Sequence, residues 1–396
     1  MKKINGNERK EKFMLLSIAL IFIIGMTLGK LCEKLKLPSL LGMLFTGILL
    51  GPYVLNLLDK NILLISPDIR KIALIIILTR AGLGLSLSEL KKIGRPAIFM
   101  CFIPASCEII GFLFLAPYLL HISLIEAAIM GAVLAAVSPA VVVPRMVKLM
   151  DEGYGIKEGI PQMVLAGSSV DDVYVIVLFS TFLSMIQGKS ASILKFVNIP
   201  VSIFLGIVIG VVIGKVLAIF FKKIHIRDTA KVLIILSISF ILVTLESKLK
   251  TPITFASLIA IMFTGIGFKK DSENVAKRLS NKYSKLWVCA EIFLFVLVGA
   301  TVNINYLGKV GVKSVVLICL ALLFRMVGVF ISLIKTGISV KEKIFAMVSY
   351  TPKATVQAAI GGVPLSMGLS CGDIVLSVAV MGIVLTAPLG LSLIHI

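Results

Sequence analysis

The sequence predicts an all-α membrane protein with about thirteen transmembrane helices. The chain has 396 residues, of which 58% are apolar and 15% are charged, and its mean hydropathy is +1.07. A water-soluble domain needs far less apolar sequence. The apolar residues form long continuous runs, which indicate helices and argue against the short alternating segments of a β-barrel. A matched pair of proline-interrupted runs further indicates a chain built from two related halves.

Polar breaks separate the apolar runs, and each run has about the length that a helix needs to cross a bilayer. We expect spans near 13–30, 39–58, 69–88, 96–118, 124–148, 158–186, 197–221, 230–246, 252–268, 286–302, 310–334, 343–367 and 373–393. The first run follows a basic stretch that resembles a signal peptide, but no small-x-small cleavage site follows it, so we interpret it as a retained span. Residues 1–396 then form a single integral membrane domain.

The net charge of +20 does not indicate nucleic-acid binding, because the basic residues lie in short connections between spans. Connections after odd-numbered spans carry more Lys and Arg than the others, and the longest of them runs over 269–285. The positive-inside rule makes this side cytoplasmic, together with the C-terminus. The basic N-terminal tail conflicts with the outside position that this topology gives it. The six cysteines are scattered without a CxxC pair, which indicates neither a metal site nor a disulfide framework.

Two spans are interrupted in the same way. The runs AAVSPAVVVP at 135–144 and SYTPKATVQAAIGGVP at 349–364 each contain Ser-Pro or Thr-Pro, with a second Pro downstream. Proline has no N–H, so the carbonyls of Ala135 and Val348 should lose their helical partners. Such backbone is tolerated at membrane depth only next to protein or a water-filled cavity. A matched pair of interrupted helices in two halves therefore indicates a transporter site.

The ionisable residues within the spans are few, and their signs nearly balance. They are Arg80, Glu108, Asp171, Asp172, Glu291, Arg325 and Lys353. Charges in the bilayer are costly unless paired, and Glu108 and Arg325 each lie in the span just before an interrupted one. We therefore predict a Glu108–Arg325 ion pair, which exchange of both charges should preserve better than either single change. The sequence leaves the partner of Arg80 open and favours an interfacial, structural position for Glu291.

Asp171 and Asp172 are adjacent in the span after the first interruption, in AGSSVDDV. Neighbours on a helix point about 100° apart, so one carboxylate can face the break at Ser138 while the other turns to a partner such as Lys353. Ser168 and Ser169 lie one turn earlier and are near enough to join the site. Two close carboxylates titrate as a coupled pair, and one of them can then hold either a proton or a small cation. Carboxylate, hydroxyl and freed carbonyl oxygens suit Na⁺ or Li⁺; the competing interpretation is a structural acidic pair neutralised by Lys353.

Two other classes fit the residues less well. An intramembrane aspartyl protease needs its two Asp residues on different spans and a Gly-x-Gly-Asp motif, whereas the single Gly-Asp here is Gly372-Asp373. A sodium-coupled symporter needs a larger polar cavity than these spans can line. Nothing in the sequence resembles the repeated filter loop of a channel.

The motifs LAAVSPAVVVPRM, AGSSVDDV and TPKATVQAAIGGVPL, with LTRAGLGL before them, resemble those of the monovalent cation:proton antiporters. The similarity is to the NHA-type branch, related to the NapA- and NhaA-type antiporters, and covers about residues 80–364. It implies two inverted repeats with crossed interrupted helices, alternating access and a homodimer. It further implies a core part around 69–186 and 286–393 and a dimerisation part made by the remaining spans.

The resemblance also implies roles for individual residues. Asp172 would carry the cation and the proton, with Asp171 beside it and backbone groups near Val137 and Ser138 completing the site. Lys353 would neutralise the crossing of the half-helices, and Thr351 and Thr355 would lie in the surrounding shell. Arg325 stands where relatives with two aspartates often have the lysine tied to electrogenic exchange, so electroneutral exchange becomes plausible.

The sequence therefore predicts a transporter rather than an enzyme. It would be a multi-pass protein of the cell membrane that exchanges Na⁺ or Li⁺ for H⁺ without a cofactor. Its partners would be monovalent cations, protons, lipid and a second copy of the chain. A K⁺/H⁺ antiporter of the same fold stays open, because cation choice depends on details of geometry that the sequence does not contain.

Overall fold

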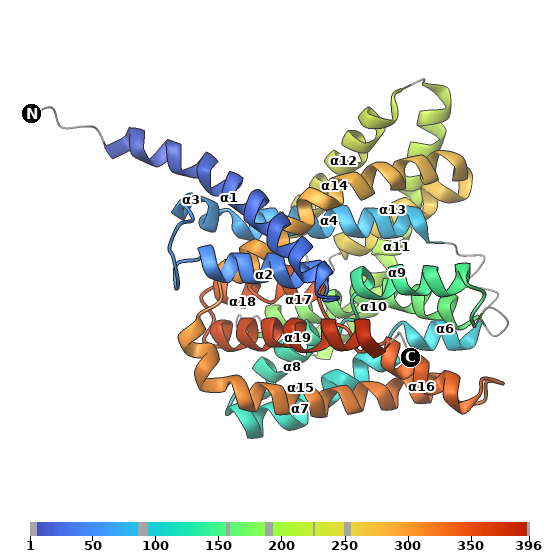
Figure 1. Ribbon diagram of the computed structural model, residues 1–396. Helices are drawn as coiled ribbons and strands as arrows, with labels where there is room; N and C mark the ends of the chain where they lie inside the picture. The colour runs from blue at the N-terminus through green and yellow to red at the C-terminus, as the bar shows by residue number, and fades with distance from the viewer. Residues whose placement is uncertain are drawn as a thin grey trace, which may run out of the picture.

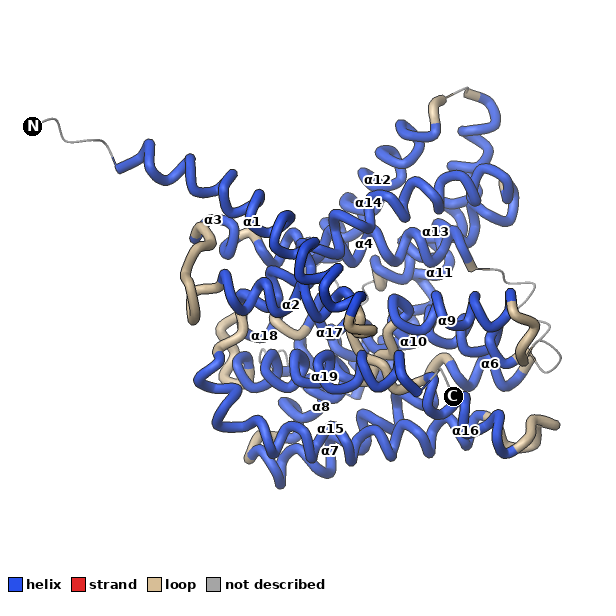
Figure 2. Tube along the Cα trace, in the orientation of Figure 1, coloured by secondary structure: helices blue, strands red, loops and turns tan. Residues whose placement is uncertain are grey.

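The computed structural model describes residues 6–85, 94–155, 159–186, 193–224, 226–248 and 255–393. Over these ranges the chain forms helices joined by loops, without a strand (Figure 2). Eight of the described helices are long and apolar enough to cross a membrane. The predicted all-α polytopic class is confirmed. The count of thirteen spans stays a prediction, because several of the expected spans are shorter or interrupted helices.

The first half of the chain runs from the N-terminus to the helix that carries the two aspartates. Its helices are α1 (Gly6–Lys34), α2 (Ser39–Leu50), α3 (Lys60–Leu64), α4 (Ser66–Gly84), α6 (Arg95–Met100), α7 (Ile103–Leu120), α8 (Leu124–Leu134), α9 (Pro139–Asp151) and α10 (Ile160–Ile186).

The second half of the chain contains the second of the two interrupted helices. Its helices are α11 (Ile193–Lys223), α12 (Asp228–Lys248), α13 (Ser257–Asp271), α14 (Glu273–Ala300), α15 (Ile304–Ser332), α16 (Val340–Ser349), α17 (Thr355–Ile360), α18 (Val363–Ser366) and α19 (Gly372–Leu393).

The segment expected as the longest connection, 269–285, is mostly helical rather than a loop. α14 begins only two residues after α13 ends and continues without a break into the apolar run. The reason lies in its period: Ala276, Leu279, Tyr283 and Trp287 are buried, which is the three-to-four-residue spacing of an amphipathic helix. The charged residues between them occupy the exposed side of the same helix.

The helices pack in two groups, which Figure 1 shows in its upper and lower parts. The flanking group consists of α1, α2, α4 and α11–α14, with close packing of α4 on α13 and α14 and of α2 on α1 and α14. The site group consists of α6–α10 and α15–α19, with α7 packed along α15. The two groups meet where α17 packs on α4 and α14, and where α10 packs on α11. The expected division into core and dimerisation parts stays a prediction.

Glycine allows the closest helix contact in the flanking group. Gly47 of α2 lies so near α14 that a Cβ atom there would overlap the backbone carbonyl of Val296. Small residues let the backbones of membrane helices approach in this way, so that dispersion contacts hold the helices together. This contact fixes α2 against α14.

Both interrupted helices begin with the same capping motif. Ser123 and Glu126 form a capping box at the start of α8, and Ser339 and Glu342 form one at the start of α16. In each box the serine hydroxyl accepts a hydrogen bond from the backbone N–H of the glutamate, and the glutamate carboxylate accepts one from the backbone N–H of the serine. The repeated motif gives α8 and α16 fixed starting points at corresponding positions in the two halves.

Candidate ion-binding site

The two predicted interruptions are present and cross each other. The first helix stops at Leu134 and restarts at Pro139, and the second stops at Ser349 and restarts at Thr355. The backbone N–H of Ser138 donates to the carbonyl of Pro352 at 2.8 Å, so one break is hydrogen-bonded directly to the other. The residues on both sides of this bond are buried, which places the crossing inside the protein.

Side chains from the second half satisfy the carbonyls freed at the first break. The carbonyl of Ala135, expected to lack a helical partner, accepts a hydrogen bond from Nη1 of Arg325. The carbonyl of Leu134 accepts one from Nζ of Lys353 at 2.5 Å. Cationic donors thus replace the missing helical N–H groups at the break.

The second break differs from the expectation. The carbonyl of Val348 is not left unpaired, because it accepts the backbone N–H of Thr351 at 3.1 Å and the hydroxyl of the same residue at 2.8 Å. Thr351 therefore closes the end of α16 locally, in a tight turn, rather than facing the break as a free ligand.

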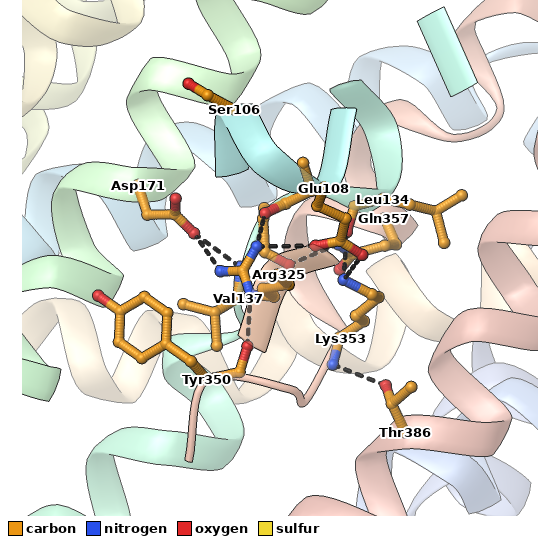
Figure 3. A network of polar contacts seen from close by, with 12 residues as sticks. Ser106, Glu108, Leu134, Val137, Asp171, Arg325, Tyr350, Lys353, Gln357 and Thr386 are labelled. Atoms are coloured by element: carbon orange, nitrogen blue, oxygen red, sulfur yellow. Dashed lines mark hydrogen bonds and ion pairs between the residues drawn. The ribbon is translucent and has the colours of Figure 1, made fainter. Parts of the chain in front are cut away.

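Four ionisable side chains form a continuous buried network across the break, seen in Figure 3. Arg325 lies in the middle: its Nη1 is 2.8 Å from Oε2 of Glu108, and its Nη2 is 2.8 Å from Oδ2 of Asp171. The other oxygen of Glu108, Oε1, is 2.6 Å from Nζ of Lys353. All four side chains are fully buried, so each charge depends on these contacts for its stability.

The assignment of Lys353 as the partner of an aspartate is therefore wrong. Lys353 pairs with Glu108, and the cation beside Asp171 is Arg325. Glu108 comes from α7 and projects between the two cations, close enough to contact both (Figure 3). The Glu108–Arg325 pair predicted from the sequence is present, but as one link of a longer chain of charges.

Asp171 and Asp172 have different surroundings. Oδ2 of Asp171 accepts the backbone N–H of Val137 at 3.0 Å in addition to its ion pair with Arg325. Asp172 takes part in none of the ion pairs within the described chain. Its Oδ1 is buried without a hydrogen-bond partner there, as is Oδ1 of Asp171. The helix thus turns one aspartate into the network and leaves the other unneutralised.

The surrounding hydroxyl groups fall into two sets. The hydroxyls of Ser138 and Thr355 lie 3.4 Å apart at the crossing, and the Ser138 hydroxyl also accepts the N–H of Thr355. The hydroxyl of Ser168 is occupied by the carbonyl of Leu165 at 3.0 Å. The side chain of Ser169 lies outside the described part of the chain.

Arg80 and Glu291 lie outside the buried charge network. The two residues lie on α4 and α14 in the flanking group, and neither takes part in the ion pairs of the buried network.

Two further buried residues, one through its side chain and one through its backbone, hold the crossing together. Nε2 of Gln357 donates to the carbonyl of Ala136 at 2.9 Å, and the carbonyl of Tyr350 accepts from Nε of Arg325 at 2.5 Å. Sequence reasoning missed both residues. Gln357 had a visible signal: it lies four positions after Lys353, and an amide in an otherwise apolar span needs a partner.

The charges of the site leave one negative charge uncompensated. Three carboxylates, on Glu108, Asp171 and Asp172, face the two cations Arg325 and Lys353. A buried excess charge is costly, and a single bound proton or monovalent cation would remove it. No group of three or more His, Cys, Asp or Glu side chains suited to a metal ion occurs among the described residues. The unpaired oxygens of Asp171 and Asp172 are the anionic positions open to a ligand.

Crossed interrupted helices with buried carboxylates at their centre define a membrane transporter for small ions. Residues 16–396 match the family model of the sodium/hydrogen exchanger transmembrane domain. The chain therefore belongs to the sodium/hydrogen exchanger family, as the resemblance of its motifs had indicated.

Individual relatives agree with this assignment. The chain is 34% identical to human sodium/hydrogen exchanger 9B2, over 98% of this chain and 75% of the relative. It is 31% identical to human sodium/hydrogen exchanger 9B1, over 97% of this chain and 78% of the relative. The fold matches that of the sodium proton antiporter MjNhaP1 from Methanocaldococcus jannaschii with a TM-score of 0.84 and 20% identity, covering 97% of this chain and 96% of the other.

Proposed function

We propose that the protein exchanges one Na⁺ or Li⁺ ion for one proton, with Asp172 carrying either ion by alternating access. One observation carries this proposal. The buried site has one more carboxylate than it has cations, and Asp172 is the carboxylate without an ion pair. One monovalent cation or one proton neutralises the site equally well, but both together leave it with an excess positive charge. Competition for the same charge is what couples the two ions.

The same charge balance supports electroneutral exchange. Whichever ion is bound, the site carries no net charge, so neither crossing of the membrane moves charge. Arg325 is fully engaged by Glu108, Asp171 and two backbone carbonyls. It is therefore unsuited to release a proton as a second transported ion. We expect one cation to be exchanged for one proton.

The test reconstitutes the protein in liposomes that contain a pH-sensitive dye. We expect NaCl or LiCl to discharge an imposed pH gradient at the same rate with and without a clamped membrane voltage. Asp172→Asn should abolish this exchange while the protein stays folded, because Asp172 has no described partner to lose. Full activity of that variant would exclude the assigned carrier, and discharge by KCl with equal efficiency would favour a K⁺/H⁺ antiporter.

The pH dependence provides a second measurement on the same liposomes. If Na⁺ and H⁺ compete for one carboxylate, the apparent KM for Na⁺ rises about tenfold for each unit of pH below the pKa of that carboxyl. Vmax at saturating Na⁺ should change much less over the same range. An apparent KM that does not vary with pH would contradict competition at a single site.

We also propose a homodimer in the cell membrane with a cytoplasmic C-terminus. The excess of Lys and Arg on the connections between α11 and α12 and between α15 and α16 supports this topology. Light scattering in detergent should give about twice the chain mass of 42.7 kDa. Reaction of a cysteine introduced after residue 393 with a membrane-impermeant reagent in intact cells would contradict the topology.

A further inference from the structure

A buried cation outside the ion-binding network lies where the two helix groups meet. Arg70, in the second turn of α4, is only 2% exposed. Its guanidinium lies against Gly362, between α17 and α18, so closely that a Cβ atom at Gly362 would overlap Nη1 of Arg70. Since α4 belongs to the flanking group and α17 to the site group, this contact joins the two.

The charge of Arg70 is not neutralised in this arrangement. Its Nη1 has no hydrogen-bond partner, and neither has the buried hydroxyl of Ser66 one turn before it. Nε makes one long bond, to the carbonyl of Ser66 at 3.4 Å. No ion pair within the described residues includes Arg70. A buried, unpaired charge destabilises the arrangement that contains it.

The part of the site group nearest to Arg70 has the opposite electrostatic sign. Gly362 lies two residues after Ile360, the last residue of α17. Backbone carbonyls concentrate negative partial charge at that end of the helix. The other end of α17 begins at Thr355, which contacts Ser138 at the crossing. α17 spans its six residues, which is roughly 9 Å of helix. A shift of its outer end is thus passed directly to the ion-binding site.

We propose that Arg70 is a positioning residue for transport, which acts through α17. In the present arrangement the guanidinium of Arg70 lies beside the end of α17 with some of its N–H groups unbonded. When the site group shifts along α4, these N–H groups form hydrogen bonds with the carbonyls at the end of α17. Arg70 thereby raises the free energy of the present arrangement relative to the shifted one. Because the present arrangement is not too stable, the protein can alternate between the two. This inference rests on the proposed function, because it presupposes alternation between two arrangements.

The proposal makes a prediction that a merely structural role does not. Arg70→Met removes the unpaired charge and keeps the apolar stem, so it should stabilise the arrangement seen here. We expect this variant to unfold at the same or a higher temperature than the unmodified protein, yet to have a Vmax at least tenfold lower. Na⁺ binding should persist, measured as the rise in unfolding temperature on adding Na⁺. Arg70→Lys keeps the charge and should restore part of the Vmax.

A double-substitution cycle tests the contact with Gly362. Gly362→Ala alone should change Vmax, because its methyl group overlaps Nη1 and displaces the guanidinium of Arg70. In the Arg70→Met background the same change should have a much smaller effect on Vmax, since no guanidinium is left to displace. Equal effects of Gly362→Ala in both backgrounds would overturn the assigned contact.

Two results would overturn the role of Arg70. One is an unchanged Vmax in Arg70→Met; the other is a lower unfolding temperature with a proportional loss of activity, which would mark a structural residue. These results differ from a failure of the proposed function, which would appear in the unmodified protein as the absence of Na⁺-driven proton movement.

Discussion

The shared position of Glu108 allows a sharp test of the charge network. One of its oxygens contacts Arg325 at 2.8 Å and the other contacts Lys353 at 2.6 Å. Glu108→Gln keeps the shape of the side chain and removes the charge that both buried cations share. Removing one partner of a buried ion pair typically costs about 3–5 kcal/mol. That cost corresponds to roughly a 10²–10⁴-fold larger equilibrium constant for unfolding.

Exchanging the charges of Glu108 and Arg325 distinguishes a charge network from an isolated ion pair. An isolated pair, as the sequence alone predicts, would be restored by Glu108→Arg combined with Arg325→Glu. In the network, the new carboxylate at position 325 would lie near Asp171 and the new guanidinium at position 108 would lie near Lys353, in place of the present ion pairs of 2.8 and 2.6 Å. Like charges so close in a low-dielectric interior repel strongly. The exchanged protein should therefore be less stable than Glu108→Gln.

The measurement is thermal unfolding in detergent, followed by fluorescence. The chain has a single Trp, Trp287 in α14, which is 6% exposed and should report its transfer to solvent. We expect the unfolding temperature to fall in the order unmodified protein, Glu108→Gln, exchanged protein. Recovery of the original unfolding temperature by the exchange would refute the shared network and return Glu108 and Arg325 to a simple pair.

Two further predictions separate the aspartates and test the packing. Asp171→Asn should lower the unfolding temperature more than Asp172→Asn in the same assay, because only Asp171 has an ion pair and a backbone N–H bond to lose; equal shifts would contradict this difference. Gly47→Ala should destabilise the protein by about 1–3 kcal/mol, since its methyl group overlaps the carbonyl of Val296. Gly84→Ala, whose Cβ meets nothing within 4 Å, is the matched control and should unfold like the unmodified protein.

Much of the fold could be predicted because its signals are local. Continuous apolar runs predicted the helical membrane class. The Ser-Pro and Thr-Pro motifs predicted both interruptions at the correct residues. The Glu108–Arg325 pair also followed, because a buried charge needs an opposite one and few were available. The start of α14 was missed, although its spacing of Ala276, Leu279 and Tyr283 is equally local.

The arrangement within the site could not be predicted in the same way. Asp171 and Arg325 are 154 residues apart in the chain, and no pattern in either segment indicates which cation faces which carboxylate. Lys353 was assigned to an aspartate for this reason, whereas Glu108 lies between the two cations and takes both. Arg70 was overlooked because an arginine near the end of an apolar run ordinarily reaches the membrane surface. Only the packing of α17 reveals that it is buried.

The charges of the network are divided unequally between the two halves of the chain. All three carboxylates, on Glu108, Asp171 and Asp172, come from the first half, and both cations, Arg325 and Lys353, come from the second. Two copies of the first half would gather six acids at their centre, and two copies of the second would gather four bases. If the polypeptide were cut between α10 and α11, the two fragments should consequently reassociate one to one. Two copies of the same fragment should not associate, because their buried charges would repel.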